Sequence, residues 1–257
     1  MGIPIPMGAI GKLGIPGILL VVGIVVLSSM FGGASQDPAA APAGDPDSEL
    51  VDFLSFVLDD IQNEWEDIFR LSGMQYERAE LVLFDGYTES ACGGASEVVG
   101  PHYCPLDRRV YLDLGFFRAL SERYGAKGDF AQAYVLAHEI GHHVQNLLGT
   151  LGEVQAMQGS GRGDPNELSV RLELQADCYA GVWGHTTFQR DLLESGDLEE
   201  ALTAAAAVGD DRLQGASSGS VDPETFTHGT SEQRMTWFRV GFDTGDPAAC
   251  DTFTGDV

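Results

Sequence analysis

The sequence predicts an α+β protein that is mainly helical, with a small β-sheet and one transmembrane helix before the folded domain. Three observations lead to this prediction. Several long segments carry apolar residues at helical spacing, only two short apolar runs resemble strands, and residues 13–31 form an uncharged, mostly apolar stretch. The chain of 257 residues has room for one ordinary globular domain or two small ones.

The apolar stretch at residues 13–31 approaches the roughly 20 residues with which a helix crosses a bilayer. Lys12 precedes it and the acidic part of the chain follows it, which favours a short cytoplasmic tail at residues 1–12 and a folded domain outside the cytoplasm. A cleaved signal peptide is the alternative, because a Gly-Gly-Ala sequence follows the apolar core. Residues 32–48, rich in Ala, Pro and Asp, are expected to form a flexible linker.

The folded domain, residues 49–257, is expected to begin with a helix. Its apolar positions recur four and three residues apart at Leu54, Leu58, Ile61, Trp65 and Ile68. Residues 80–85 and 109–113 are short apolar runs that predict strands, and a Gly-rich loop joins them at residues 86–105. A short helix is expected at residues 115–124.

Capping signals mark three longer helices. One starts with Asp129 as its N-cap and stops at Gly149. The next starts at Asp164 and Pro165, where Glu167 can complete a capping box. The third covers residues 197–208 and has the same Asp-x-x-Glu start.

The chain is strongly acidic, with a formal net charge of −25, and all 39 acidic residues lie after position 36. Such a surface repels phosphate backbones, so nucleic acid is excluded as a partner. We favour solubility or salt tolerance as the reason for this charge, and a preference for basic substrates is the alternative.

The four cysteines show no CxxC spacing. Cys92 and Cys104 lie in the Gly-rich loop and suit a disulfide, which leaves Cys178 to pair with Cys250. Four cysteines allow three pairings, so this connectivity is a hypothesis. Disulfides would place the domain in an oxidising compartment.

The sequence His138-Glu139-Ile140-Gly141-His142 carries the most specific chemistry in the chain. Two histidines four residues apart project from one face of a helix, within reach of a single metal ion. Glu139 lies beside that ion, where it can accept a proton from water. The apolar flanks bury this helix on both sides, and inward-facing histidines need a partner.

A catalytic zinc ion takes three protein ligands and keeps one position open. His143 is turned about 100° from His142 and is a poor third ligand. Glu173 and Asp177 share one face of the helix after Asp164, which predicts Glu173 as the third ligand and Asp177 as the acceptor that orients a ligand histidine. The alternative is a solvated acidic face.

HExxH followed by ExxxD on a later helix resembles the gluzincins, a class of zincin peptidase. The stretches LVLFDG, YCPLDRRVYLDLGFF, GDFAQAYVLAHEIGHHVQNLLG and SVRLELQADCYAGVW closely resemble the bacterial neutral zinc metallopeptidase family (YpfJ-like), and the resemblance covers roughly four fifths of the chain. It implies a gluzincin-like peptidase domain after an N-terminal membrane span. It also implies one Zn²⁺ ion held by His138, His142 and Glu173, with Glu139 as the catalytic base.

Further downstream, His228 and Arg234 resemble the His-Pro…Arg element that some membrane gluzincins carry after their ExxxD helix. A cation or neutral imidazole near the open metal position could stabilise the oxyanion formed when water attacks a peptide carbonyl. The alternative is a capping loop in which Thr230 or Ser231 starts a helix.

Together these features predict a membrane-anchored zinc metallopeptidase, single-pass in the cell membrane, with its peptidase domain on the extracytoplasmic side and a peptide or protein as substrate. A free edge of the small sheet is expected to bind the substrate backbone as an added strand. Two alternatives remain open: a non-catalytic zinc-binding scaffold or sensor with the same ligands, and an anchored structural domain without metal.

Overall fold

The computed structural model describes residues 48–96, 100–219 and 221–257. The predicted tail, the predicted membrane-spanning helix at residues 13–31 and the linker up to residue 47 lie outside the described residues. Within the described ranges, no helix has the length and apolar character that crossing a membrane requires.

The first helix, α1 (Ser48–Leu71), starts one residue before the predicted domain boundary. Its predicted apolar stripe is confirmed at Leu54, Ile61 and Trp65, which are buried, whereas Leu58 and Ile68 are half-buried at the edges of the stripe. The stripe packs α1 against the main hydrophobic core.

The two predicted strands are present as β1 (Glu80–Phe84) and β5 (Arg109–Asp113). They pair in parallel, and β4 (His102–Cys104) pairs antiparallel with the other side of β5. The sheet order is therefore β1-β5-β4, so β5 is the central strand and β1 and β4 are the outer strands.

The expected loop at residues 86–105 is not simply a loop, and this prediction was wrong. It contains β4 and an antiparallel hairpin of β2 (Tyr87–Ser90) and β3 (Gly93–Ser96). These strands are three or four residues long, and the Gly-rich, polar hairpin lacks the alternation of apolar residues by which a strand is predicted from sequence.

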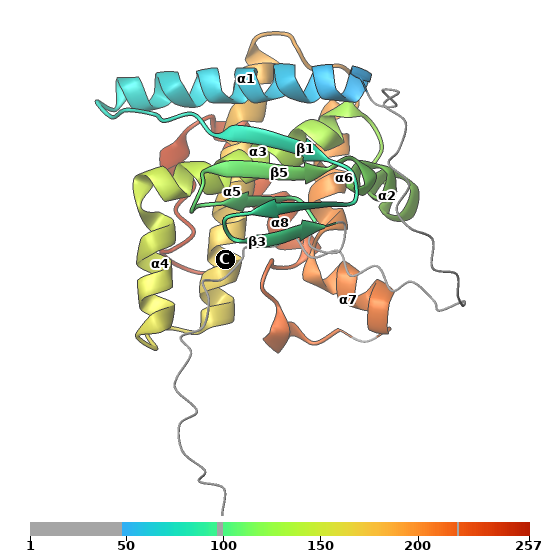
Figure 1. The fold of residues 1–257 in the computed structure, drawn as a ribbon. Helices are drawn as coiled ribbons and strands as arrows, with labels where there is room; N and C mark the ends of the chain where they lie inside the picture. The colour runs from blue at the N-terminus through green and yellow to red at the C-terminus, as the bar shows by residue number, and fades with distance from the viewer. Residues whose placement is uncertain (1–47, 97–99, 220) are drawn as a thin grey trace, which may run out of the picture.

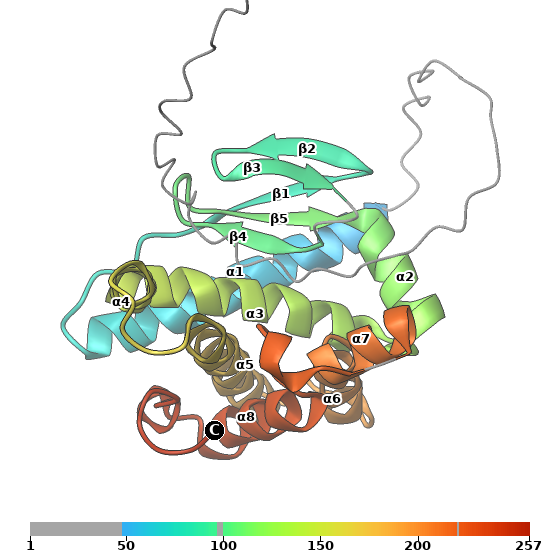
Figure 2. The same ribbon diagram turned by 90° about the horizontal axis from the view of Figure 1, so that it is seen from below.

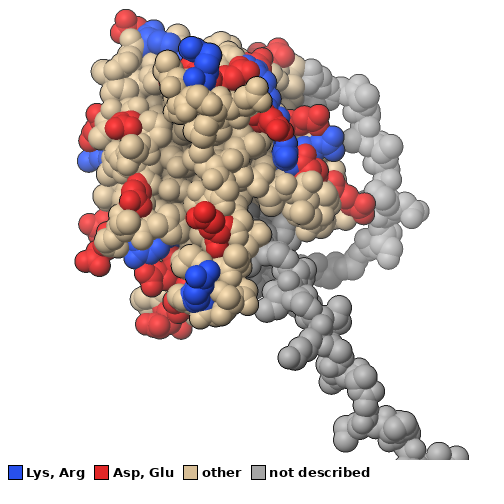
Figure 3. All heavy atoms as spheres, turned by 90° about the vertical axis from the view of Figure 1, so that its left-hand side faces the viewer, with Lys and Arg blue, Asp and Glu red and all other residues tan. Residues whose placement is uncertain are grey.

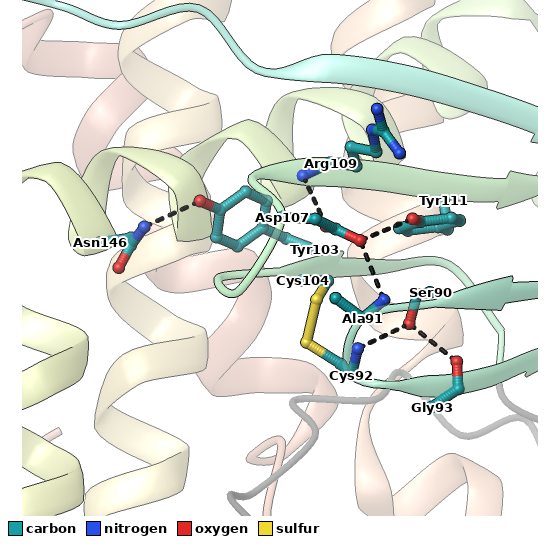
Figure 4. The surroundings of a disulfide bond; sticks show 10 residues. All are labelled: Ser90, Ala91, Cys92, Gly93, Tyr103, Cys104, Asp107, Arg109, Tyr111 and Asn146. Carbon is teal, nitrogen blue, oxygen red and sulfur yellow. Dashed lines mark hydrogen bonds between the residues drawn. A yellow bond between two sulfur atoms is a disulfide. The ribbon is translucent and has the colours of Figure 1, made fainter.

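A disulfide between Cys92 and Cys104, as predicted, ties this hairpin to β4 (Figure 4). Asp107 reinforces the link, since its Oδ2 accepts hydrogen bonds from the backbone N–H of Ala91 at 3.0 Å and from the Tyr111 hydroxyl at 2.8 Å. The hairpin is therefore fastened to the sheet by side chains, without strand pairing between them.

The predicted helices are present as α2 (Leu114–Tyr124), α3 (Asp129–Leu148), α5 (Pro165–Gln189) and α6 (Asp197–Ala207). The cap at Asp164 is confirmed, because its side chain accepts from two backbone N–H groups of α5. The caps predicted at Asp129 and Asp197 are wrong: the N-caps are the preceding glycines. Glu167 closes no capping box; its carboxylate pairs with Arg171 one turn later.

Two helices were not predicted, α4 (Thr150–Gly159) and α7 (Asp210–Ser218). Helix α8 (Ser231–Thr244) was foreseen as the alternative for this region: Thr230 is its N-cap and forms a capping box with Gln233. Two short 3₁₀ helices, Pro223–Thr225 and Pro247–Ala249, complete the elements of the described chain.

The elements form layers around α3 (Figures 1 and 2). Figure 2 shows the sheet and hairpin on one side of α3, and α5, α6 and α8 on the other. Helices α5 and α8 touch backbone to backbone, because a Cβ atom on Gly181 or on Gly241 would overlap a carbonyl oxygen of the other helix. Cys178 of α5 also forms the predicted disulfide with Cys250 beyond α8. These contacts hold α8 and the segment after it against α5.

On the face shown in Figure 3, acidic and basic side chains lie around a broad region without charged residues. The excess of acidic residues is thus not gathered into a single acidic patch on this face.

Candidate metal centre

The site lies where α3 crosses α5, and a glycine allows the two helices to meet. A Cβ atom on Gly141 would lie 2.9 Å from the backbone oxygen of Ala176, which is closer than real Cβ atoms approach. Gly141 is flanked by the HExxH residues, and Ala176 lies between Glu173 and Asp177. The close contact therefore brings the two predicted motifs face to face.

His138, His142 and Glu173 converge at this crossing. Each offers one ligand atom, and these atoms lie within 4.8 Å of one another. The Nε2 atom of His138 is 3.1 Å from Oε2 of Glu173, and Nε2 of His142 is 3.5 Å from Oε1. All three side chains are buried, with at most 3% of their surface exposed.

The second nitrogen of His138 points to Asp177. Nδ1 lies 2.8 Å from Oδ1 of Asp177, so it donates a proton to the carboxylate and leaves Nε2 free to face Glu173. Arg234 holds the same carboxylate with two hydrogen bonds, from Nε to Oδ2 at 2.8 Å and from Nη2 to Oδ1 at 3.0 Å. Asp177 thus lies where it can orient His138, as predicted, and Arg234 holds its carboxylate in place.

Two neighbours of the histidines did not emerge from the sequence. The Tyr134 hydroxyl donates to Oδ1 of Asp177 at 2.5 Å, and the amide oxygen of Gln145 lies 2.9 Å from Nδ1 of His142. Tyr134 is four residues before His138 and Gln145 is three after His142, so helical spacing places both on the metal-facing side. This spacing is the signal by which the sequence could have identified both residues.

Glu139 is buried beside this group with both carboxylate oxygens unsatisfied by any residue of the described ranges. Burial raises the pKa of Glu139 to about 7, although His138 opposes this shift. A cavity of about 10 Å³ borders Glu139 and His138, which is room for about one water molecule. A buried carboxylate without a partner is costly, so a ligand or water is expected there.

The three candidate ligand side chains have shifted pKa values. Burial lowers the pKa of His142 to about 4. Burial also disfavours the charged form of His138, but Asp177 and Glu173 together raise its pKa to about 9. Burial would raise the pKa of Glu173, yet the charges of His142 and His138 hold it well below its usual range. The shifts of His142 and Glu173 favour the forms that bind metal, a neutral imidazole and an ionised carboxylate, whereas His138 has to release a proton before it can bind.

This donor set fits a divalent zinc ion. Two imidazole nitrogens and a carboxylate are the zinc ligands of many catalytic sites, and one coordination position stays open. Oε1 of Glu173 has no hydrogen-bond partner among the described residues. A doubly charged ion together with Arg234 would also balance the three buried carboxylates of Glu139, Glu173 and Asp177.

His228 lies at the margin of the site. Its Nδ1 is 3.0 Å from Oδ1 of Asp210, and Asp210 also accepts the backbone N–H groups of residues 227–229. Burial lowers the pKa of His228, but Asp210 and the charge of Glu173 raise it above its ordinary value. The loop thus has the capping role of the alternative interpretation, and its imidazole also senses the charge of Glu173, a candidate ligand.

The remaining histidines have structural surroundings. His143 lies between Tyr76 and Tyr103, with its Nδ1 3.0 Å from the Tyr103 hydroxyl. His102 stacks on Tyr111 with ring centroids 5.1 Å apart, and His185 lies against the carbonyl of Phe242. None of the three belongs to the candidate metal group.

Fold and site therefore define an α+β protein with a buried centre suited to a divalent metal. The family described as "Putative neutral zinc metallopeptidase" matches residues 8–253, and the chain belongs to this family. The uncharacterized protein YpfJ of Escherichia coli K12 is 50% identical over 220 residues, which are 85% of this chain and 77% of YpfJ. The uncharacterized protein Rv2575 of Mycobacterium tuberculosis H37Rv is 49% identical over 192 residues, 70% of this chain and 64% of Rv2575. No solved structure matches the chain.

Proposed function

We propose that this chain is a zinc-dependent metallopeptidase that hydrolyses peptide bonds. The observation that carries the proposal is the buried, unpartnered Glu139 carboxylate beside the three converging side chains of His138, His142 and Glu173. A purely structural metal site needs no such carboxylate, whereas a hydrolytic site needs a base next to the attacking water.

His138, His142 and Glu173 would hold the ion, the two histidines through Nε2. Zinc bound there would supply Lewis acidity and lower the pKa of a water molecule towards about 7. Glu139 accepts the proton of the attacking water and passes it to the leaving amine. A carboxylate whose pKa is about 7 suits both steps, because it can take and release a proton near neutral pH.

His228 is the candidate for stabilising the oxyanion in this reaction. If it acts in this way, His228→Ala lowers kcat while the zinc content stays at the wild-type level. Unchanged turnover would leave the loop with its capping role alone. Arg234 is assigned no contact with substrate, since its guanidinium is committed to Asp177.

The edge of β4 is the proposed place for the substrate backbone. In the three-stranded sheet of the described residues, β5 is paired on both sides, so β1 and β4 are the strands of this sheet that can accept an added strand. The Tyr103 hydroxyl on β4 lies 3.0 Å from Nδ1 of His143 and accepts from the Asn146 amide at 2.9 Å, so this strand lies against α3, the helix that carries Glu139. A proline at position 103 should raise KM with zinc content unchanged; an unaltered KM would rule out this edge.

The first experiment compares the full chain with its Glu139→Gln variant for zinc content and for cleavage of a peptide library. We expect one zinc ion in both proteins and cleavage by the wild type alone. Equal cleavage by both would remove Glu139 from the mechanism. Absence of zinc from both would overturn the metal site itself.

The second candidate function is a non-catalytic zinc-binding scaffold or sensor. It is favoured by the burial of the ligands and by a neighbouring cavity with room for about one water molecule. One zinc ion in both proteins, with no cleavage of any library peptide and no binding of a hydroxamate inhibitor, would select this function. Hydroxamate binding to the zinc-loaded protein would show an open coordination position and support the peptidase.

We also propose that residues 13–31 anchor the chain in the cell membrane with the folded domain on the extracytoplasmic side. Two disulfides in the domain agree with an oxidising compartment. The full chain should stay in the membrane fraction after alkaline carbonate extraction and be digested by protease added from outside. Release of the chain with a new N-terminus after residue 31 would instead identify a cleaved signal peptide.

A further inference from the structure

Gln145 contacts His142 in only one orientation of its side-chain amide. Its Nε2 donates to the backbone oxygen of Leu172 at 2.7 Å and to Oε1 of Gln175 at 3.1 Å. With both N–H groups used, Oε1 is the atom that faces Nδ1 of His142, at 2.9 Å. An amide oxygen only accepts hydrogen bonds, so Nδ1 of His142 must carry the proton and Nε2 must be free.

Gln175 continues this chain of hydrogen bonds to the C-terminal segment. Its Nε2 donates to the backbone oxygen of Cys250 at 3.0 Å. Cys250 is itself fixed by the disulfide to Cys178, one turn beyond Gln175 on α5. The hydroxyl of Thr252 donates to the backbone oxygen of Arg171 at 2.6 Å and fastens the same segment to α5.

We propose that Gln145 is the positioning residue for His142: it fixes the Nδ1–H tautomer, and Gln175, held by the segment Cys250–Val257, fixes Gln145. The proposal rests on the proposed zinc site. It extends that site through two side-chain amides and one disulfide to the C-terminal segment of the domain.

The two histidines are thus oriented by different chemistry. His138 donates to a carboxylate, Asp177, whose charge is balanced by Arg234. His142 donates to a neutral amide. A carboxylate at position 145 would add a fourth anion to Glu139, Glu173 and Asp177, and among the described residues the hydrogen bonds of Gln145 reach no Lys or Arg that would balance it. The amide supplies the acceptor without the charge.

A simpler interpretation gives Gln145 only a structural role, in which its hydrogen bond to Leu172 joins α3 to α5. Two variants separate these roles. Gln145→Leu removes both the acceptor for His142 and the donor to Leu172. Gln145→Glu keeps an oxygen acceptor for His142 and loses the donor. Asn146→Ala, which removes a hydrogen bond to the Tyr103 hydroxyl on the other side of α3, is the matched control.

The experiment reads the ring nitrogens of His142 by ¹⁵N NMR in the zinc-free full chain, and zinc affinity by competition with a chelator. We expect the Nδ1–H tautomer in the wild type, in Gln145→Glu and in Asn146→Ala, and a shift towards the Nε2–H tautomer in Gln145→Leu. Zinc affinity should fall about 10- to 100-fold in Gln145→Leu, and by far less in Gln145→Glu.

An unchanged tautomer in Gln145→Leu would overturn the proposal, as would a Gln145→Glu variant that matches Gln145→Leu in both measurements. The tautomer of His142 is read without zinc, so this measurement tests Gln145 even if the wild type binds no metal. Failure of the wild type to bind zinc would refute the proposed zinc site and leave the role of Gln145 in fixing the tautomer untouched. Gln175→Leu should lower zinc affinity less than Gln145→Leu, because it leaves the contact between Gln145 and His142 in place.

Discussion

Asp177 and Arg234 form an ion pair at the centre of the domain, with both side chains at most 1% exposed. The Arg234 guanidinium holds both carboxylate oxygens, and Oδ1 also accepts from His138 and Tyr134. One carboxylate therefore joins α3, α5 and α8 and orients a candidate zinc ligand. The stability of the domain and the proposed metal binding are therefore expected to depend on the same residue.

Asp177→Asn should separate these two contributions. Loss of the charge takes the nearest anion from the buried Arg234 guanidinium and leaves only Glu173, at 3.9 Å; breaking a buried ion pair costs about 3–5 kcal/mol of unfolding free energy. Loss of the carboxylate acceptor for His138 lowers zinc affinity about 10- to 100-fold. Denaturant unfolding and chelator competition measure the two effects. Adding Arg234→Met should recover much of the stability and none of the zinc affinity; recovery of both together would mean that Asp177 acts only through the fold.

Gly141→Ala should push α3 away from α5. The added Cβ would lie 2.9 Å from the Ala176 backbone oxygen, and overpacking of this kind costs about 1–3 kcal/mol. Because His138 and His142 face Glu173 across this contact, zinc affinity should fall as well. Gly152→Ala in α4 is the control: its Cβ meets no atom within 4 Å, so the variant should be as stable as the wild type or slightly more so. Equal behaviour of the two variants would contradict the close-contact interpretation.

The residues that were predicted from sequence are those whose pattern is local. HExxH and ExxxD show themselves by spacing within one helix, and periodic apolar residues reveal helices α1, α3 and α5. Helix α4 has glycines at positions 152 and 159 and no side-chain cap, so neither periodicity nor capping marks it. The hairpin of β2 and β3 depends on a disulfide and on Asp107, which act between distant positions.

The support around the ligands was only partly predictable for the same reason. Tyr134 and Gln145 share a helix face with the histidines, so spacing could have identified them. Gln175 acquires its role from Gln145 and Cys250, two residues that α5 meets only in the folded protein. Arg234 was placed near the metal by resemblance, and its bidentate contact with Asp177 comes from the packing of α8 on α5.

Asp60 offers a test of pH dependence away from the metal. Its carboxylate accepts from the Trp183 indole at 2.8 Å and pairs with Arg190. Burial raises the pKa of Asp60, but the hydrogen bonds of Arg190 and Trp183 outweigh it, so the pKa in the folded protein lies below its ordinary value of 3.8. The resulting stability is present above pH 3.8 and is lost as the pH falls through the folded pKa.

Asp60→Asn should therefore destabilise the protein at pH 7 and lose this effect in strong acid. Chemical denaturation from pH 7 down to pH 2 measures the difference from the wild type, with Asp52→Asn on the exposed side of α1 as the control. A destabilisation that stays constant over this range would mean that the charge of Asp60 contributes nothing, and no destabilisation at pH 7 would mean that the neutral amide replaces the carboxylate contacts.

The two disulfides should differ in their effect on stability and on the metal site. Cys178–Cys250 closes a sequence separation of 72 residues and Cys92–Cys104 one of 12. Chain entropy predicts that removal of Cys178–Cys250 lowers the free energy of unfolding by about 4 kcal/mol, and that removal of Cys92–Cys104 lowers it by about 3 kcal/mol. Only the longer one fixes Cys250, whose carbonyl holds Gln175, so Cys178→Ala/Cys250→Ala should also weaken zinc binding. Cys92→Ala/Cys104→Ala is the matched variant, and its expected result is lower stability at wild-type zinc affinity. In the described part of the chain, the hairpin makes no hydrogen bond to the candidate ligand side chains. A loss of zinc affinity of the same size in both variants would therefore mean that the fold is loosened in general and that Cys250 has no specific role.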